Sequence, residues 1–198
     1  ENNLIYDRGI KKSRFYYYGP MFRHERPQKG RYRQFTQFGV EFFGDKNISE
    51  EIDLILLSQS IFEKLGIDNL TLNLNTIGTF DDRKEYTKKL YKYLIDFSKK
   101  LTSSQNTTLE KNPLRLLDSK DDNLKDIISN APSLIDFINT KSKTDFKTIL
   151  SMLDDLDVHY NVNYKLVRGL DYYNDFVFEW TTNDLGSQDA ICAGGRYD

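Results

Sequence analysis

The chain has 198 residues, enough for one large or two small domains around a buried core. Its 28 basic and 30 acidic residues exclude a global field that would draw it to nucleic acid or to an anionic membrane, so any affinity for anions must be local. A single cysteine excludes an internal disulfide and predicts a reducing compartment, the cytoplasm; two distant histidines argue against a structural zinc site.

Two stretches near the N-terminus predict an antiparallel hairpin. Ser13–Phe22 and Phe35–Gly44 are rich in aromatic and β-branched residues, which favour strands. The connection between them is basic, and Arg outnumbers Lys in it: Arg23, Arg26, Lys29, Arg31 and Arg33. A solvated basic turn is one interpretation, but Arg reads phosphate and carboxylate oxygens in a planar, bidentate way, so the composition favours an anion site.

Strand periodicity places alternate residues of the second stretch on one face. Phe35, Gln37, Gly39 and Glu41 share that face. If this face is buried, Glu41 needs a cation or a ligand N–H, because an unpaired buried carboxylate is costly.

A helix and a strand should follow the hairpin as scaffold. The apolar spacing predicts a helix over Ser49–Leu65, with Ser49 as its N-cap and Gly66 as its stop. Strict alternation over Leu70–Asn75 predicts a strand with one buried face.

A capping box of Thr79 and Asp82 predicts a helix that extends to about Leu101. Its polar side carries lysines at i, i+4 spacing, namely Lys84, Lys88 and Lys92. A solvated helix face is favoured over contact with an RNA backbone, although both interpretations stay open.

The rest of the middle is predicted to be mostly helical. Residues 102–108 are expected to form a polar loop, Asn112–Pro113 a break, and three short helical patterns follow: 123–129, 132–138 and 144–156. We therefore predict a helical insertion over residues 80–157 between two parts of one core, 1–79 and 158–198. Strand patterns return at Val158–Val167 and Phe176–Thr182.

Between and after these strands lie further polar groups and glycines. Arg168 precedes a glycine, and Asp171 with two tyrosines supplies polar handles. Gly194–Gly195 permits close approach of a ligand or of another backbone. An ion-paired turn and a glycine bend remain alternatives. Taken together, these segments indicate a cavity for a phosphate ester and a small polar molecule, without a Walker or Rossmann phosphate loop.

Three long motifs carry a resemblance to a known family. GPMFRHERPQKGRYRQFTQFGVEFFG resembles motif 2 of class II aminoacyl-tRNA synthetases as found in histidyl-tRNA synthetases, and LVRGLDYYNDFVFEW and AGGRYD resemble the two histidine-specific signatures. NPLRLLDSK and LGSQ are also similar to family sequence, so the likeness covers nearly the whole chain. The resemblance implies an α+β fold with an antiparallel six-stranded class II sheet and a helical insertion domain. It also implies an enzyme that makes histidyl-adenylate from histidine and ATP, and then histidyl-tRNA.

The resemblance also implies roles for residues at the ATP site. Arg23 would bind the α-phosphate, Phe35 would stack on adenine, Glu25 would meet the adenine edge and Arg31 would reach the outer phosphates. Arg168 would bridge the α-phosphate and the histidine carboxylate, where other class II enzymes place a metal ion. Mg²⁺ is expected on the outer phosphates, although no carboxylate cluster identifies protein ligands for it.

A second group of residues matches the histidine pocket of the family. Gln37 and Glu41 would hold the amino group and the imidazole, and Tyr172, Tyr173 and Tyr197 would line the pocket. In the family the helical insertion approaches the acceptor arm of tRNA(His), which gives the three lysines a partner.

Other family features are expected to lie outside these residues. Motif 1, with much of the homodimer interface, should precede residue 1, while motif 3 and the anticodon-binding domain should follow residue 198. We therefore expect a fragment that is inactive alone. The alternative is a non-catalytic, histidine-sensing regulatory subunit of similar fold, but such relatives tend to lose the motifs that are present here.

Overall fold

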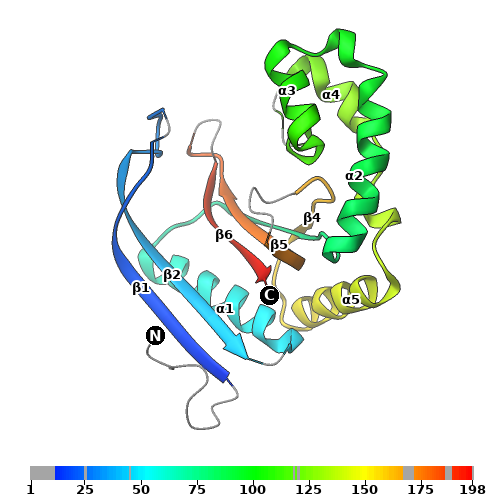
Figure 1. The fold of residues 1–198 in the computed structure, drawn as a ribbon. Helices are drawn as coiled ribbons and strands as arrows, with labels where there is room; N and C mark the ends of the chain where they lie inside the picture. Colours follow the sequence, from blue (N-terminus) through cyan, green and yellow to red (C-terminus); the bar gives the residue numbers. More distant parts are fainter. Residues whose placement is uncertain are drawn as a thin grey trace, which may run out of the picture. The chain divides into compact units, whose positions relative to one another are not determined.

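The computed structural model describes residues 12–24, 26–44, 46–117, 119, 121–166, 172–185 and 189–197 (Figure 1). The chain divides into two compact units. The first comprises residues 1–69 and 182–189, and the second comprises residues 70–181 and 190–198. Among the described residues, each unit has a sheet of its own, with two strands in the first and four in the second.

The first unit is built on the predicted hairpin, which is confirmed. Strand β1 (Lys12–Phe22) pairs antiparallel with β2 (Gln34–Gly44) without a register shift, from Lys12 opposite Gly44 to Phe22 opposite Gln34. Aromatic and β-branched residues fill both strands because they pack well on a pleated surface. The hairpin is therefore continuous up to the residues that flank the Arg-rich connection.

Helix α1 (Ile48–Leu65) follows the hairpin and is tied to it by charge. The guanidinium of Arg14 donates to Glu50 at 3.0 Å and to Asp53 at 2.5 Å. A second cation, Lys12, donates to Glu50 at 2.9 Å, and this bond is the main cause that lowers the pKa of the Glu50 carboxyl. The first turns of α1 thus lie against the edge strand β1.

The ends of α1 confirm one prediction and correct another. Gly66 ends the helix in the left-handed conformation, with φ 66°, as predicted. The N-cap is Asn47 rather than Ser49, whose backbone N–H donates to the Asn47 side chain at 3.0 Å. Both residue types cap well, and Asn47 wins because the helix begins one residue before Ser49.

The second unit contains a four-stranded sheet in the order β4-β3-β5-β6. Its strands are β3 (Leu70–Thr76), β4 (Asn161–Val162), β5 (Tyr173–Thr182) and β6 (Ala190–Tyr197). The pair β5–β6 is antiparallel, whereas β3 and β4 run parallel. The predicted strand over 158–167 is wrong for most of its length, because only Asn161 and Val162 pair and the chain then turns. The α+β class is confirmed.

Helices make up the described part of residues 80–157. They are α2 (Phe80–Ile95), α3 (Ser103–Lys111), α4 (Asp122–Ser129) and α5 (Thr140–Asp155), with short 3₁₀ turns at Ser98–Lys100, Pro113–Leu116 and Leu134–Asp136. In Figure 1, α3 and α4 lie beside the far end of α2. Because the compact units divide the chain at other residues, the three-part domain division stays a prediction.

Two predictions for the helical segment need correction, namely the end of α2 and the loop where α3 forms. The capping box of Thr79 and Asp82 is present, but α2 ends at Ile95 instead of continuing to about Leu101. Residues 103–111 form α3 where a polar loop was predicted. The overlooked signal is a second capping box, in which Thr102 and Gln105 bond each other's backbone N–H. This local cap stabilises a helix even though the composition of the stretch is polar.

One apolar cluster joins the helices to the sheet. Tyr86, Leu90 and Leu94 are each 1% exposed or less and form the buried side of α2. The cluster continues through α3 and α4 to Val177 of β5 and Leu166 before it, and Tyr173 packs against it. The helical segment and the start of β5 therefore share a core.

Loss of the Thr102 cap should loosen α3 locally. Thr102→Ala removes the acceptor for the Gln105 N–H, so the local free energy of opening should fall by about 1 kcal/mol and amide hydrogen exchange across α3 should rise about fivefold. Thr107→Ala, which removes an exposed hydroxyl of the same helix, is the matched control. Equal exchange in the two variants would contradict the role of the cap.

Candidate active site

The Arg-rich connection ends in a tight turn. Gln28 and Arg31 pair through both backbone bonds, at 3.1 and 2.9 Å, and Gly30 between them has φ 74°. Glycine suits that left-handed position because it has no Cβ. The Lys29 ammonium donates to the carbonyl of Asp184 at 2.8 Å. The turn is thus anchored to the segment that follows β5.

Arg23 is held at the base of this connection. Its backbone N–H donates to the carbonyl of Arg33, and its Nε donates to the carbonyl of Tyr32, both at 2.8 Å. The guanidinium lies over the ring of Phe35, 3.9 Å from the ring centroid. The Nε bond and the Phe35 ring together fix the plane of the Arg23 guanidinium. The Nε bond uses only one of the N–H donors of this group, and the others can reach an anion.

The face predicted for β2 is confirmed. Phe35, Gln37, Gly39 and Glu41 are half-buried, whereas Phe38 on the other face is exposed. The amide nitrogen of Gln37 donates to the hydroxyl oxygen of Tyr17 at 2.5 Å. The Gln37 carbonyl oxygen is then the atom of this side chain that can accept from an ammonium group.

Tyr17 is a member of this face that sequence reasoning missed. It lies opposite Gly39 in the register, and a Cβ at Gly39 would overlap the Tyr17 ring. The glycine therefore lets the ring cross β2 and reach Gln37. No local signal marks this contact, because Tyr17 and Gly39 become neighbours only when the strands pair.

In the second unit, the structure brings together the three tyrosines predicted for one pocket. Tyr173 pairs with Tyr197 across β5 and β6. The Tyr172 ring lies 4.8 Å from that of Tyr173 and 5.7 Å from that of Tyr197, between centroids. Such tilted and edge-to-face arrangements stabilise aromatic groups, and each tyrosine carries a hydroxyl group that can hydrogen-bond.

Two glycines of β6 make room for this arrangement. A Cβ at Gly195 would meet the carbonyl of Phe176 and the ring of Tyr173, and a Cβ at Gly194 would meet the ring of Phe178. The sequence predicted close approach of a ligand or of another backbone here. The neighbours are the backbone of β5 and its aromatic rings.

The remaining predicted residues fall into two classes. Glu25 and Arg168 lie outside the described residues, so their predicted roles have no geometry. Lys84, Lys88 and Lys92 are exposed along α2, on the side opposite its buried residues. In the described part of the chain, His, Cys, Asp and Glu form no group of three or more that could hold a metal ion.

Comparison with protein families bears directly on these features. A family model described as histidyl-tRNA synthetase matches residues 7–198, which is nearly the whole chain and includes the hairpin, the helices and the tyrosine cluster. The chain belongs to the histidyl-tRNA synthetase family. The resemblance stated from the three motifs is therefore confirmed.

Curated relatives of this synthetase family member are similar over the full chain. It is 50% identical over 199 residues to a histidine–tRNA ligase of Francisella philomiragia, and 51% identical to that of Francisella tularensis subsp. holarctica. These matches cover 100% of this chain but 46% and 47% of the relatives. The chain thus spans about half the length of the curated relatives that it matches.

Solved structures agree on the fold. The apo histidyl-tRNA synthetase of Staphylococcus aureus matches 93% of this chain and 43% of its own, with 34% identity and a TM-score of 0.70. A Bacillus halodurans protein described as an ATP phosphoribosyltransferase regulatory subunit/histidyl-tRNA synthetase has 21% identity and a TM-score of 0.57, which shows the fold alone. The class II synthetase fold is therefore confirmed. Within the described residues, no helix is long and apolar enough to cross a membrane.

Filling the space at Gly39 should disturb the candidate site. Gly39→Ala forces the Tyr17 ring away and breaks its bond with Gln37, which should cost about 1–3 kcal/mol and lower the Tm by roughly 2–8 °C. Gly19→Ala is the matched control, because a Cβ at Gly19 meets nothing within 4 Å. Thermal unfolding that gives equal Tm values for both variants would contradict this account of Tyr17.

Proposed function

We propose that this chain is the catalytic core of a histidine–tRNA ligase. It activates histidine with ATP to histidyl-adenylate and pyrophosphate, and the histidyl group then passes to the 3′ end of tRNA(His). The observation that carries the proposal is the arginine held flat over Phe35 beside the Gln37 and Glu41 face, in a chain half identical to histidine–tRNA ligases. ATP, histidine and tRNA(His) are the substrates, and the setting is cytoplasmic.

Arg23 acts on the α-phosphate. In the activation step, a carboxylate oxygen of histidine forms a bond to the α-phosphorus of ATP, and the bond from that phosphorus to the pyrophosphate oxygen breaks. Negative charge builds on the α-phosphate oxygens in the transition state. A planar guanidinium, already fixed by the Tyr32 carbonyl and the Phe35 ring, can stabilise that charge without first being ordered.

The other ATP contacts follow from the family resemblance. Arg31 reaches the outer phosphates from the tight turn, and Glu25 meets the adenine edge. Phe35 stacks on adenine with the ring face opposite the one that Arg23 covers. Arg168 bridges the α-phosphate and the substrate carboxylate, which brings the two reacting groups together.

Selection of histidine divides between two surfaces. The Gln37 carbonyl oxygen accepts from the substrate ammonium group, and the half-buried Glu41 binds the imidazole. By the family resemblance, the cluster of Tyr172, Tyr173 and Tyr197 in the second unit also takes part in histidine selection. Hydrogen bonds to imidazole nitrogens reject amino acids without them, because the polar groups of the pocket would then be desolvated and unpaired.

Mg²⁺ is expected with the outer phosphates of ATP, where it would neutralise charge on the leaving pyrophosphate. The described residues offer no cluster of carboxylates or histidines for it.

Transfer to tRNA gives a role to the helical segment. The exposed lysines of α2 contact phosphates of the acceptor arm, and the protein works as a homodimer. The alternative is a histidine-sensing regulatory subunit. Identity of 50% to a curated histidine–tRNA ligase favours the enzyme.

Amino-acid-dependent ATP–pyrophosphate exchange tests the activation step. The product of the open reading frame that contains this chain should exchange with histidine alone among the twenty amino acids. Arg168→Ala should abolish exchange, and Arg23→Lys, which keeps the charge but loses the planar fork, should lower it about 100-fold. A folded protein that binds histidine but does not exchange would support the regulatory subunit instead.

Charge reversal on α2 tests the division between activation and tRNA binding. Lys88→Glu with Lys92→Glu should weaken tRNA(His) binding about tenfold or more at low salt, because lost phosphate contacts weaken association. Histidine-dependent exchange should stay within about twofold, since activation does not use these side chains. Lys125→Glu with Lys147→Glu, on exposed sites of α4 and α5, changes the net charge equally and is the control. Equal loss of binding and exchange would refute the division.

A further inference from the structure

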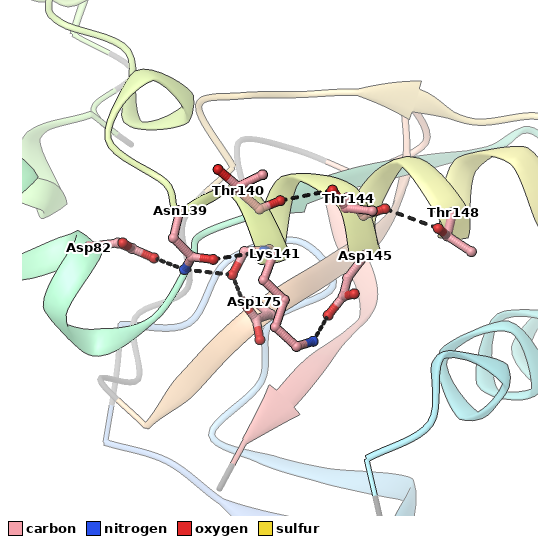
Figure 2. Close-up of polar contacts among 9 residues, drawn as sticks. Asp82, Asn139, Thr140, Lys141, Thr144, Asp145, Thr148 and Asp175 are labelled. Carbon is pink, nitrogen blue, oxygen red and sulfur yellow. Dashed lines mark hydrogen bonds and ion pairs between the residues drawn. The ribbon is translucent and has the colours of Figure 1, made fainter.

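A polar network with a buried end joins three segments that are distant in the sequence (Figure 2). Its members are Asp82 in α2, Asn139 before α5, Ser142 in α5 and Asp175 in β5, hereafter the Asp82–Asp175 network. The Asn139 amide donates to Asp82 at 2.6 Å and to Ser142 Oγ at 3.0 Å. The Ser142 hydroxyl donates to Asp175 Oδ1 at 2.5 Å.

Asp175 has an uncommon backbone conformation, with φ 52°. This left-handed region is uncommon for residues other than glycine, although asparagine and aspartate tolerate it. Its N–H donates to the carbonyl of Gly78 at 2.9 Å, and its carbonyl accepts from the N–H of Ile77 at 2.7 Å. The segment between β3 and α2 therefore hydrogen-bonds the backbone of Asp175, while α5 hydrogen-bonds its side chain.

The hydrogen bond between Ser142 and Asp175 stabilises the fold because both residues are buried. Ser142 is 3% exposed and Asp175 is 8% exposed, so either group without its partner would lose solvation without compensation. At Asp82, burial alone would raise the pKa of the carboxyl, but hydrogen bonds from the Thr79 backbone and the Asn139 side chain lower it on balance. The network thus contains a carboxylate that stays charged at neutral pH.

A second bridge runs beside the network. Arg83, next to Asp82 in α2, donates through its two terminal nitrogens to the carbonyl of Gly78 at 2.9 Å and to Asn174 Oδ1 at 3.3 Å. Asn174 and Asp175 directly follow Tyr173 in the chain. Contacts from α2 and α5 therefore converge on the two residues after a tyrosine of the predicted pocket.

The pairing of β5 with β6 shows why that position needs support. Tyr173 lies opposite Tyr197, but the register shifts between Asn174, opposite Arg196, and Val177, opposite Gly195. An irregularity of this kind re-aims the side chains on one side of it relative to the rest of the strand. The direction of Tyr173 thus depends on the conformation at Asp175.

We propose that Ser142 and Asp175 are positioning residues for amino-acid recognition: through the Asp82–Asp175 network, α2 and α5 hold the start of β5 so that Tyr173 is aimed into the histidine pocket. This inference rests on the proposed function, because it assigns Tyr173 to histidine. It adds that residues of the helical segment, which do not touch substrate, set the affinity for the amino acid and not that for ATP.

Variants at Asp175 separate the role of its backbone conformation from that of its side-chain acceptor. Asp175→Gly keeps access to the left-handed conformation but removes the acceptor, whereas Asp175→Ala removes both. Asp175→Asn keeps both, since asparagine also tolerates this conformation and has a carbonyl oxygen. Ser142→Ala removes the hydroxyl that donates to Asp175, and with it the acceptor of one of the two Asn139 bonds. Ser58→Ala, in α1, removes another buried serine hydroxyl, which donates to the carbonyl of Ile55, and is the matched control.

The experiment measures KM for histidine, KM for ATP and kcat in pyrophosphate exchange, with Tm, on the product of the open reading frame. In Ser142→Ala and Asp175→Gly, KM for histidine should rise about fivefold while KM for ATP stays within about twofold. Asp175→Ala should raise KM for histidine further, and Asp175→Asn should restore it to within about twofold of the unchanged protein. Ser58→Ala should lower Tm without changing either KM.

Three outcomes would overturn the inference. An unchanged KM for histidine in Ser142→Ala and Asp175→Ala, with a lowered Tm, would show a structural role only. A parallel rise of both KM values would show general loosening of the unit. The third outcome is the absence of histidine-dependent exchange in the wild-type protein, which would overturn the proposed function and this inference with it. The first two outcomes require a wild-type protein that exchanges, so the third cannot be confused with them.

Discussion

The uninterrupted register of β1 against β2 is the constraint on which the candidate ATP and histidine contacts depend. Side chains alternate between the faces of a strand, so a slip by one residue would move every one of them to the opposite face. With Gly39 opposite Tyr17 and Met21 opposite Phe35, the half-buried face carries Phe35, Gln37 and Glu41 together. The same pairing closes the ends of the strands around Arg23, whose N–H bonds across the hairpin.

That constraint explains why so much of the first unit could be predicted from sequence. The strands and their alternation follow from local composition and from a period of two residues. The plane of Arg23 and the partner of Gln37 could not be predicted, because a carbonyl of Tyr32 and a hydroxyl of Tyr17 become neighbours only after the strands pair. The roles of these residues came from the family resemblance, whereas their contacts came from the structure.

In the second unit, less of the structure could be predicted from sequence. A capping box predicted the start of α2, since that signal lies within one helix. The strand over 158–167 was overpredicted because alternation alone does not supply a partner strand, and only Asn161 and Val162 find one in β3. The network around Asp175 left no local signal, because its members come from residues 82, 139, 142 and 175 and meet only in the folded chain.

Asp82 and Asn139 close the helical segment into a loop whose two ends meet at one bond. The entropic cost of closing a loop grows only with the logarithm of its length, by about 0.6 kcal/mol for each doubling. Residues far from those ends can therefore be added, removed or exchanged in evolution at little cost to the fold that bears the tyrosines. The helical segment is free to diversify away from its two ends, while the bond between those ends keeps the starts of α2 and α5 together.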